Sequence, residues 1–479
     1  MSLIEAAKGA RAELAAIANP RERLLRLVQI TRIFAEEVVG LFTIAPYGWR
    51  AFRTYRTLLR LTNAATATRK GVSMVQDVRY GPQPRNVMDI YLPATSTPSA
   101  ASPAGKQGAV PVALFCHGGV WAMGEKWQFA PMALRLAQAG VLTVVLHYTL
   151  YPKATAAQMT REVSEAISWT LDHIGSYGGD SRQVSLLGHS AGGQLCAMAL
   201  LHRAKAASRA KAGGKSSSCY PDGRMPARFL GMAAVYDIAK HYEFEDGRGV
   251  AELSTMKRAL GGRQQFALQS PAVILSRALE KAHGSPPVTS TDALSSWQPY
   301  YQSFKLKGQA IAQRTGFERL AAPDSGLSRT SNGSKAAVNT NQRRKERITN
   351  GQQEQQPPAA ELERLQQPSA SDADSLADFS AADAAHLPPC VLLSSCRDRT
   401  VPWHESAEMY WHLHDCSVPC KHLMYEKPGH ADFVIDWRPL SGHKAGDAFS
   451  TAGLPDFAED VVKIVTNQVE VQYTRAKQV

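Results

Sequence analysis

The sequence has few cysteines, and their spacing excludes two common ways of stabilising a fold. Seven cysteines occur among 479 residues, and no two of them form a C-x-x-C pair. Cys116, Cys196 and Cys390 stand in or beside apolar runs, as reduced thiols do when they serve as small core residues. We therefore expect neither a disulfide framework nor a zinc site, and we expect a reducing, cytosol-facing environment.

Long apolar runs and nucleotide-binding motifs are also lacking. No run of about 18 apolar residues occurs, so the sequence predicts no membrane-spanning helix. The N-terminal stretch MSLIEAAKGARAELAAIANP carries too many charges for a secretory signal peptide. No phosphate-binding loop is present, and we expect neither a metal ion nor an organic cofactor.

Acidic residues are absent from Val38 to Gln76, within a chain whose formal net charge is +12. The basic residues of this segment are Arg50, Arg53, Arg56, Arg60, Arg69 and Lys70. Nucleic acid, an acidic partner or an anionic membrane surface could each attract such a segment. Its aromatic residues favour the membrane, and we expect no binding of nucleic acid.

Residues 1–70 have apolar positions at helical spacing, and Pro46 and Gly48 are expected to divide the helix in two. Beyond the break, the arginines recur every three or four residues on one face, while Phe52, Tyr55 and Leu59 share another. Two interpretations remain open. Residues 28–60 could lie in a membrane interface, or this helix could pack on the main domain with a solvated basic face.

From residue 71 onward, strands and helices alternate. A hairpin is expected over residues 73–92, followed by the buried strands VPVALFC and VLTVVLHY with a helix between them. Further helix–strand units continue to about residue 280 and resume over 381–479. This alternation predicts an α/β fold with a mostly parallel central sheet and helices on both faces. The two parts, 71–280 and 381–479, would form one domain.

Residues 281–380 interrupt that domain. The segment is rich in Ser, Gln, Asn, Pro and mixed charge, as in SRTSNGSKAAVNTNQRRKERITNGQQEQQPP. Such a composition cannot bury enough apolar surface to offset the entropy of ordering the chain. The sequence therefore predicts a long disordered insertion here.

The stretch VSLLGHSAGGQL places a serine between a buried strand and a helix. Gly188, Ser190 and Gly192 match G-x-S-x-G, the nucleophile elbow, in which a sharp turn exposes the serine oxygen. Small neighbours are needed because the strand and the helix approach closely at the turn. We predict that Ser190 is a catalytic nucleophile.

A serine nucleophile needs a base and an acid that orients the base. Asp398 follows the buried strand CVLLSSC, and His430 lies in the loop after the next strand. The order Ser, Asp, His is that of nucleophile-elbow hydrolases. The competing bases are His404, His412, His414, His422 and His443, and the competing acids are Asp432 and Asp436. We favour Asp398 and His430.

A third group of residues, HGGVW, ends the strand VPVALFC. Glycines allow backbone N–H groups to face a developing oxyanion, so Gly118 and Gly119, with the N–H of Ala191, are the predicted oxyanion hole. His117 is interpreted as a buried residue that holds the loop by hydrogen bonds. Trp121 is predicted to line the substrate pocket.

These motifs resemble those of the α/β-hydrolase superfamily, in particular its hormone-sensitive-lipase-like esterases. A narrower resemblance, to plant-type isoprenylcysteine methylesterases, rests on YGPQPRNVMDIYLP, HGGVWAMGEKW, HIGSYGGDSRQVSLLGHSAGGQL and LMYEKPGHADFVIDW. It implies Ser190, Asp398 and His430 as the triad and the methyl ester of a prenylated C-terminal cysteine as substrate. It also implies the cytosolic face of endoplasmic reticulum or Golgi membranes, with a cytoplasmic location as the alternative.

Two features depart from a simple assignment. Many relatives have Asp-Tyr-Arg where this chain has His147, Tyr148 and Thr149, a difference that concerns packing. The flanks of Ser190 also resemble arylformamidases, which act on N-formylkynurenine.

The expected function is a serine carboxylesterase acting through an acyl-enzyme. The alternatives are an arylformamidase, a generic carboxylesterase or a non-catalytic, membrane-docked protein of the same fold; the oligomeric state is not predicted.

Overall fold

The computed structural model describes residues 10–11, 13–63, 71–93, 109–213, 223–283, 376–438 and 453–474, without the side chains of 34–44. These residues belong to one compact unit. The insertion expected over 281–380 therefore lies almost entirely outside the described residues. The division of the chain at residues 70, 280 and 380 stays a prediction.

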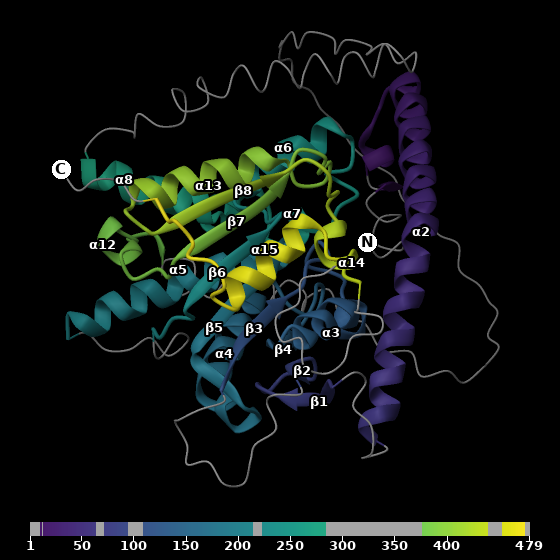
Figure 1. Cartoon of the computed structure of the whole chain (residues 1–479). Coiled ribbons are helices and arrows are strands. Elements are labelled where there is room, and N and C mark those ends of the chain that lie inside the picture. Colours follow the sequence, from purple (N-terminus) through teal and green to yellow (C-terminus); the bar gives the residue numbers. More distant parts are fainter. Residues whose placement is uncertain are drawn as a thin grey trace. The chain divides into compact units, whose positions relative to one another are not determined.

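Eight strands form a single sheet in the order β1-β2-β4-β3-β5-β6-β7-β8 (Figure 1). The β1–β2 and β2–β4 pairs are antiparallel, and the pairs from β4 to β8 are parallel. The mostly parallel sheet expected from the sequence is confirmed. The strands are β1 Ser73–Arg79, β2 Val87–Leu92, β3 Val110–Cys116, β4 Leu142–Leu146, β5 Gly179–His189, β6 Arg228–Met232, β7 Cys390–Ser395 and β8 Cys420–Tyr425.

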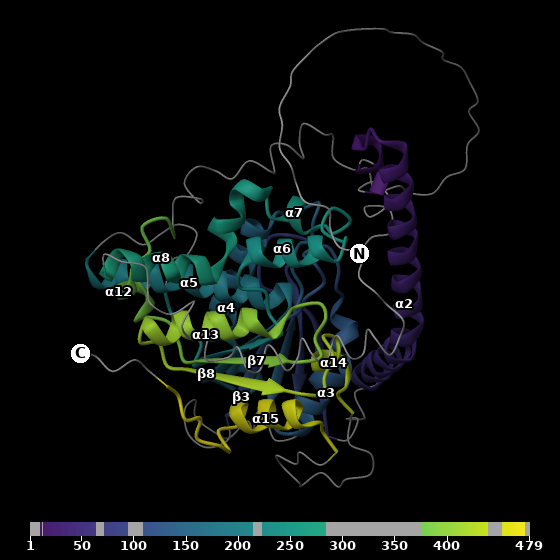
Figure 2. The same ribbon diagram turned by 90° about the horizontal axis from the view of Figure 1, so that it is seen from above.

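Helices cover both faces of the sheet, as Figure 2 shows. Alternation along β3 explains the two layers, because Val112 and Leu114 join one core cluster whereas Ala113 and Phe115 join the other. The first face carries α4 Ala156–His173, α5 Ala191–Lys211, α8 Pro271–His283, α12 Ala381–Ala384 and α13 Trp403–Asp415. The second carries α3 Ala130–Gln138, α14 Asp432–Ile435 and α15 Asp456–Val465.

The remaining described helices are short, apart from one at the N-terminus. After β6 come α6 Ile238–Gly247, α7 Met256–Ala259 and the 3-10 helix η4 Arg263–Gln269. The 3-10 helices η2 Lys126–Phe129 and η3 Ile174–Tyr177 precede α3 and β5. α6 and η4 contact each other, and residues of both join the core cluster of the first face.

The N-terminal helix α2 runs from Pro20 to Asn63 as one element of 44 residues, so the expected division at Pro46 and Gly48 is wrong. A proline removes one intrahelical hydrogen bond and often only kinks a helix. The C-terminal half of α2 packs on α3, β1 and η2 and buries Ala51, Thr54 and Leu58. This packing agrees with the second of the two interpretations left open by the sequence, and contact of the same helix with a membrane stays a prediction.

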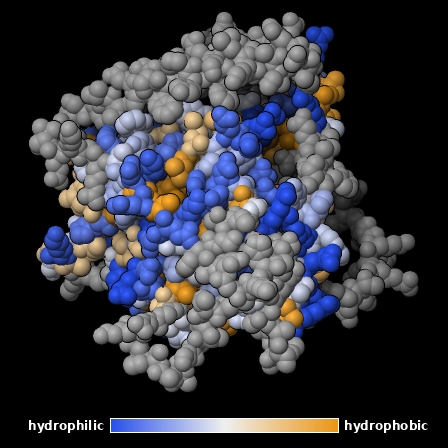
Figure 3. All heavy atoms as spheres, viewed as in Figure 1, coloured by the Kyte–Doolittle hydropathy of each residue, from blue (hydrophilic) through white to orange (hydrophobic). Residues whose placement is uncertain are grey.

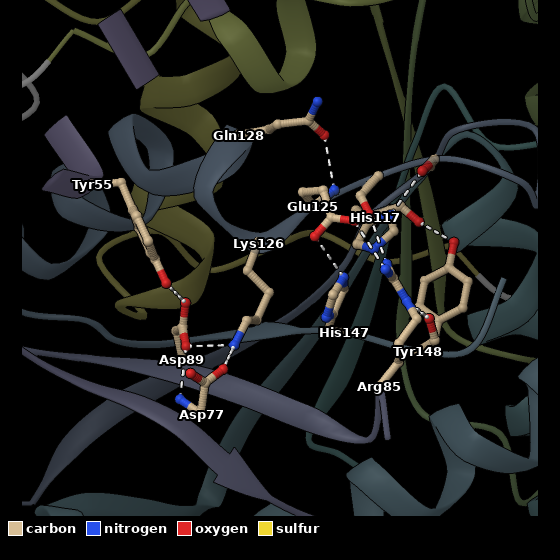
Figure 4. Close-up of polar contacts among 12 residues, drawn as sticks. Tyr55, Asp77, Arg85, Asp89, His117, Glu125, Lys126, Gln128, His147 and Tyr148 are labelled. Atoms are coloured by element: carbon tan, nitrogen blue, oxygen red, sulfur yellow. Dashed lines mark hydrogen bonds and ion pairs between the residues drawn. The ribbon is translucent and has the colours of Figure 1, made fainter. Parts of the chain in front are cut away.

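An ionic network centred on the buried carboxylate of Asp89 connects α2, β1 and η2 to strand β2 (Figure 4). Asp89 of β2 is fully buried and accepts hydrogen bonds from the Tyr55 hydroxyl (3.1 Å), the Lys126 ammonium (2.8 Å) and the Asp77 N–H (3.0 Å). Lys126 also contacts the Asp77 carboxylate. Asp77 has φ 54° and lies where the β1–β2 register shifts, so the network also stabilises a β-bulge.

Candidate active site

Ser190 occupies a sharp turn between β5 and α5. Its φ of 54° lies in the region that residues with a Cβ rarely adopt, and its N–H donates to the carbonyl of Met232 in β6 at 3.1 Å. A Cβ on Gly188 would lie 2.6 Å from the Gly193 Cα, and one on Gly192 would lie 2.3 Å from the His117 oxygen. Close backbone approach therefore explains the small residues around the serine, as expected for a nucleophile elbow.

Asp398 and His430 meet although 32 positions separate them. They lie in the loops that follow β7 and β8, and His430 Nδ1 is 2.8 Å from Asp398 Oδ2. The other carboxylate oxygen accepts the N–H groups of Thr400 and Val401 at 2.8 and 2.9 Å. Burial acts to raise the pKa of Asp398, but these hydrogen bonds outweigh it and hold the pKa below its usual value. An ionised Asp398 can orient the imidazole and stabilise its protonated form.

His189 connects the elbow to the His430 loop. Its Nε2 is 3.0 Å from the carbonyl oxygen of His430, and the two imidazole rings lie 4.7 Å apart between centroids. Burial, followed by the charge of His430, lowers the pKa of His189 to about 3, so this ring is neutral and its Nε2–H donates. Because His189 precedes Ser190, this bond ties the loop that carries His430 to the elbow. Sequence reasoning noted His189 only as a flanking residue.

The loop after β3 approaches the serine from the other side. A Cβ on Gly118 would lie 2.7 Å from the Ser190 Cβ, and Gly119 has φ +118°, where a Cβ would lie 2.3 Å from the Met123 oxygen. Both positions therefore require glycine. The Ala191 N–H opens α5, in the turn where backbone donors have no intrahelical acceptor. The structure thus brings Gly118 against Ser190, with Gly119 next to it in the loop and Ala191 directly after the serine. The assignment of these three residues to an oxyanion hole stays a prediction.

Trp121 is buried beneath this loop, with 2% of its surface exposed. Its indole N–H donates to Gln194 of α5 at 2.9 Å, and the Gln194 amide donates in turn to the carbonyl of Gln269. These contacts fix the loop against α5. The assignment of Trp121 to the substrate pocket stays a prediction.

Several of the competing bases and acids contact other groups. His412 and His414 are on α13, and His422 in β8 is 2.7 Å from the Ser394 hydroxyl. Asp432 accepts the N–H of Gly429 at 2.7 Å, which shapes the loop that carries His430. His443 lies outside the described residues.

Residues 117–124, the loop after β3, are called the glycine loop below. The sequence analysis did not identify a set of polar residues that lie behind this loop (Figure 4). Arg85, in the turn between β1 and β2, donates to the carbonyls of Tyr148 and Gly124 at 2.9 and 2.8 Å and to the Glu125 carboxylate at 2.9 Å. The Tyr148 hydroxyl donates to the carbonyl of His117 at 2.9 Å. Only Tyr148 had a signal in the sequence, as part of the packing motif after β4.

Within the described residues, no group of three or more His, Cys, Asp or Glu side chains is arranged to hold a metal ion. In the same part of the chain, no helix combines the length and the apolar character needed to cross a membrane. A hydroxyl, an imidazole–carboxylate pair and a glycine loop are the parts that acyl transfer requires.

One class of proteins combines this sheet order with an elbow after β5 and with the chain order Ser, Asp, His, which Ser190, Asp398 and His430 follow here. This chain has the α/β-hydrolase fold. The family model BD-FAE matches residues 88–257, which include the glycine loop and the elbow.

Curated relatives also match part of the chain. A probable isoprenylcysteine alpha-carbonyl methylesterase of Oryza sativa subsp. japonica is 31% identical over 200 residues, or 42% of this chain and 43% of that protein. The isoprenylcysteine alpha-carbonyl methylesterase of Arabidopsis thaliana is 30% identical with the same coverage. The kynurenine formamidase of Danio rerio is 29% identical over 140 residues, covering 29% of this chain and 43% of the relative. The chain thus spans less than half the length of these relatives.

Proposed function

We propose that this α/β-hydrolase is a serine carboxylesterase. The observation that carries the proposal is the meeting of three chain segments: Ser190 on its elbow, and the hydrogen-bonded His430–Asp398 pair, which His189 fastens beside it. His430 takes the proton of the Ser190 hydroxyl as its oxygen attacks an ester carbonyl. The tetrahedral oxyanion is stabilised by the backbone N–H groups around the serine. The alcohol leaves with the proton from His430, and water then releases the acid from the enzyme.

We propose the methyl ester of a prenylated C-terminal cysteine as the substrate. Similarity to the rice and Arabidopsis isoprenylcysteine methylesterases supports this choice. Similarity to the Danio rerio kynurenine formamidase favours a second candidate, the hydrolysis of N-formylkynurenine. Both reactions use the same triad, so the substrate has to be distinguished by measurement.

Hydrolysis of three compounds in the presence of lipid vesicles tests the proposal: farnesylcysteine methyl ester, N-formylkynurenine and a short p-nitrophenyl ester. We expect a preference for the prenylcysteine ester, and we expect Ser190→Ala to lose on the order of 10⁴-fold or more in kcat. A fluorophosphonate probe should label the wild type at Ser190 and leave the variant unlabelled. Labelling of a different residue, or an active Ser190→Ala variant, would contradict the assignment of the nucleophile.

The other outcomes separate the alternatives. Preferential turnover of N-formylkynurenine would replace the methylesterase with the formamidase. Turnover of the p-nitrophenyl ester alone would leave a generic carboxylesterase. A well-folded wild type with neither turnover nor labelling would indicate a non-catalytic protein of this fold.

We further propose that α2 binds an anionic membrane surface. Its exposed aromatic rings include Trp49 (63% exposed) and Phe52 (41%), which stack with centroids 6.1 Å apart. Arg53, Arg56 and Arg60 are exposed beside these rings. Nearer the N-terminus, Leu24, Leu25, Leu27 and Val28 are 46–70% exposed, and Figure 3 shows hydrophobic and hydrophilic atoms side by side at that end of α2. Aromatic rings with cations beside them suit the interface of an anionic membrane. The resemblance to isoprenylcysteine methylesterases leads us to propose the cytosolic face of endoplasmic reticulum or Golgi membranes as the location.

Co-sedimentation with phosphatidylcholine vesicles, with and without about 30% phosphatidylserine, tests this surface. We expect binding that needs the anionic lipid, weakens as salt is added and falls at least about tenfold in Arg53→Glu/Arg56→Glu, since each cation near the surface contributes about 1 kcal/mol. The control Arg182→Glu/Arg209→Glu makes the same change in charge on exposed arginines outside α2 and should bind like the wild type. Equal losses in both variants would show that net charge, and not α2, drives binding.

A further inference from the structure

The Tyr148 hydroxyl holds the first peptide unit of the glycine loop. It donates to the carbonyl oxygen of His117 at 2.9 Å, and Figure 4 shows the phenol pointing at that oxygen. A trans peptide is planar, so its C=O and its N–H point in opposite directions. Fixing the His117 carbonyl therefore fixes the direction of the Gly118 N–H. That N–H belongs to the residue whose Cα lies against Ser190.

The His117 side chain holds the second peptide unit in the same way. Its Nδ1 lies 2.8 Å from the carbonyl oxygen of Gly118, and among the described residues its Nε2 has no hydrogen-bond partner. Burial lowers the pKa of His117 to about 3, so the ring is neutral and its single N–H is at Nδ1. The bond fixes the Gly118 carbonyl and, across the planar peptide, the direction of the Gly119 N–H.

The Tyr148 and His117 side chains, which donate these two hydrogen bonds, are held in place by their neighbours. The rings of His117 and Tyr148 stack with centroids 4.6 Å apart, and the ring of Phe129 also stacks on His117, at 5.5 Å. Arg85 bonds the Tyr148 carbonyl and, at Gly124, the far end of the glycine loop. A Cβ on Gly124 would lie 2.2 Å from His117 Nδ1, so the loop closes tightly over the imidazole.

We propose that Tyr148 and His117 are positioning residues that aim the two glycine N–H groups of the oxyanion hole, one peptide plane each. This inference rests on the proposed esterase function. Neither side chain touches the substrate in this role. Each acts through a carbonyl on the opposite edge of the peptide whose N–H binds the oxyanion. Preorganised donors of this kind account for about 10²–10³ in rate each, and a misdirected donor loses part of that.

The variant Tyr148→Phe removes only the hydroxyl and keeps the stacked ring. We expect kcat per active site for a p-nitrophenyl ester to fall about 10- to 100-fold with KM within about threefold, because the lost interaction acts in the transition state. Inhibition by a trifluoromethyl ketone, whose adduct is an oxyanion, should weaken by a similar factor. Active sites are counted by the final extent of fluorophosphonate labelling.

Tyr80→Phe is the matched control. Tyr80 is also buried, and its hydroxyl also donates to a backbone carbonyl, that of His147, at 2.6 Å. We expect a similar loss of thermal stability in both variants but a kcat within about threefold of the wild type for Tyr80→Phe, because its bond does not hold a peptide of the glycine loop. Equal falls of kcat in the two variants would overturn the proposal in favour of general loosening of the fold.

His117 is tested by two variants of equal shape. Asn places an amide N–H near the position of Nδ1, whereas Leu has no donor. We expect His117→Asn to exceed His117→Leu at least about tenfold in kcat per active site, with similar melting temperatures. Equal activities of the two would overturn the role of the Nδ1–H. A wild type that hydrolyses no ester would instead overturn the proposed function, so the two failures are distinguishable.

Discussion

At the residue scale, Asp398 uses each carboxylate oxygen for a different purpose. One oxygen holds the backbone of its own loop and the other accepts the His430 Nδ1–H. The variant Asp398→Asn keeps the size and one acceptor but presents an amide N–H to His430. That change favours the wrong imidazole tautomer, so we expect kcat at pH 7 to fall about 10⁴-fold with little change in stability.

The control for this prediction is Asp432→Asn. Asp432 is the competing acid nearest to His430 in the sequence, and its carboxylate accepts the N–H of Gly429 in the His430 loop. We expect a loss of kcat below about tenfold, from slight loosening of the loop. Both variants are measured with the same p-nitrophenyl ester. A larger loss of kcat in Asp432→Asn than in Asp398→Asn would show that Asp432, and not Asp398, orients the imidazole.

The residues proposed as the triad could be singled out in the sequence because each has a local signal: a G-x-S-x-G motif, or a polar residue in the loop after a buried strand. His189, Arg85 and Tyr148 could not be assigned their roles in this way. Their partners are His430, Gly124 and His117, which are 241, 39 and 31 positions away. Such contacts exist only once the chain has folded, and no local pattern of residue types specifies them.

At the element scale, most strands and helices have periodic patterns that the structure follows, such as the helix α13 at Trp403–Asp415. The exceptions have physical causes. Pro46 lies inside α2, which continues on both sides of it, while Leu58 and its neighbours gain burial on α3 and η2. β5 begins at Gly179, five residues before the apolar run VSLLG, because Gly179 pairs with Val110 of β3 across the sheet. In each case tertiary contacts outweigh local propensity.

At the scale of the whole molecule, alternation predicted a parallel sheet but not its order, since the order depends on which strands pair across long connections. The order matters for the site. It places the loops after β3, β5, β7 and β8 at one edge of the sheet, where the carboxyl ends of parallel strands lie together. The site is therefore a property of the assembled sheet, and its stability depends on that of the whole fold.

Buried neutral histidines make that stability depend on pH. Burial lowers the pKa of His117, His147 and His189 to about 3, and for His147 the charges of Arg85 and Lys126 lower it further. In the unfolded chain the pKa returns to about 6.5, so between these values the unfolded state binds more protons and folding becomes less favourable as the pH falls. At pH 5 each histidine then costs about 2 kcal/mol relative to pH 7.

One other histidine works in the opposite direction. Glu405 lies 2.7 Å from His241 and, against the effect of burial, raises the pKa of that imidazole, so protonation of His241 favours the folded state as the pH falls below its raised pKa. Among the described residues, burial also lowers the pKa of His404 and, to about 4, that of His422. Five losses stand against one gain, and we expect the free energy of unfolding in urea to decrease by at least about 4 kcal/mol from pH 7 to pH 5. His147→Gln, which removes one of the five, should reduce this decrease. An unfolding free energy that stays constant or rises over this interval would show that these imidazoles are protonated in the folded protein, which would also remove the tautomer assigned to His117.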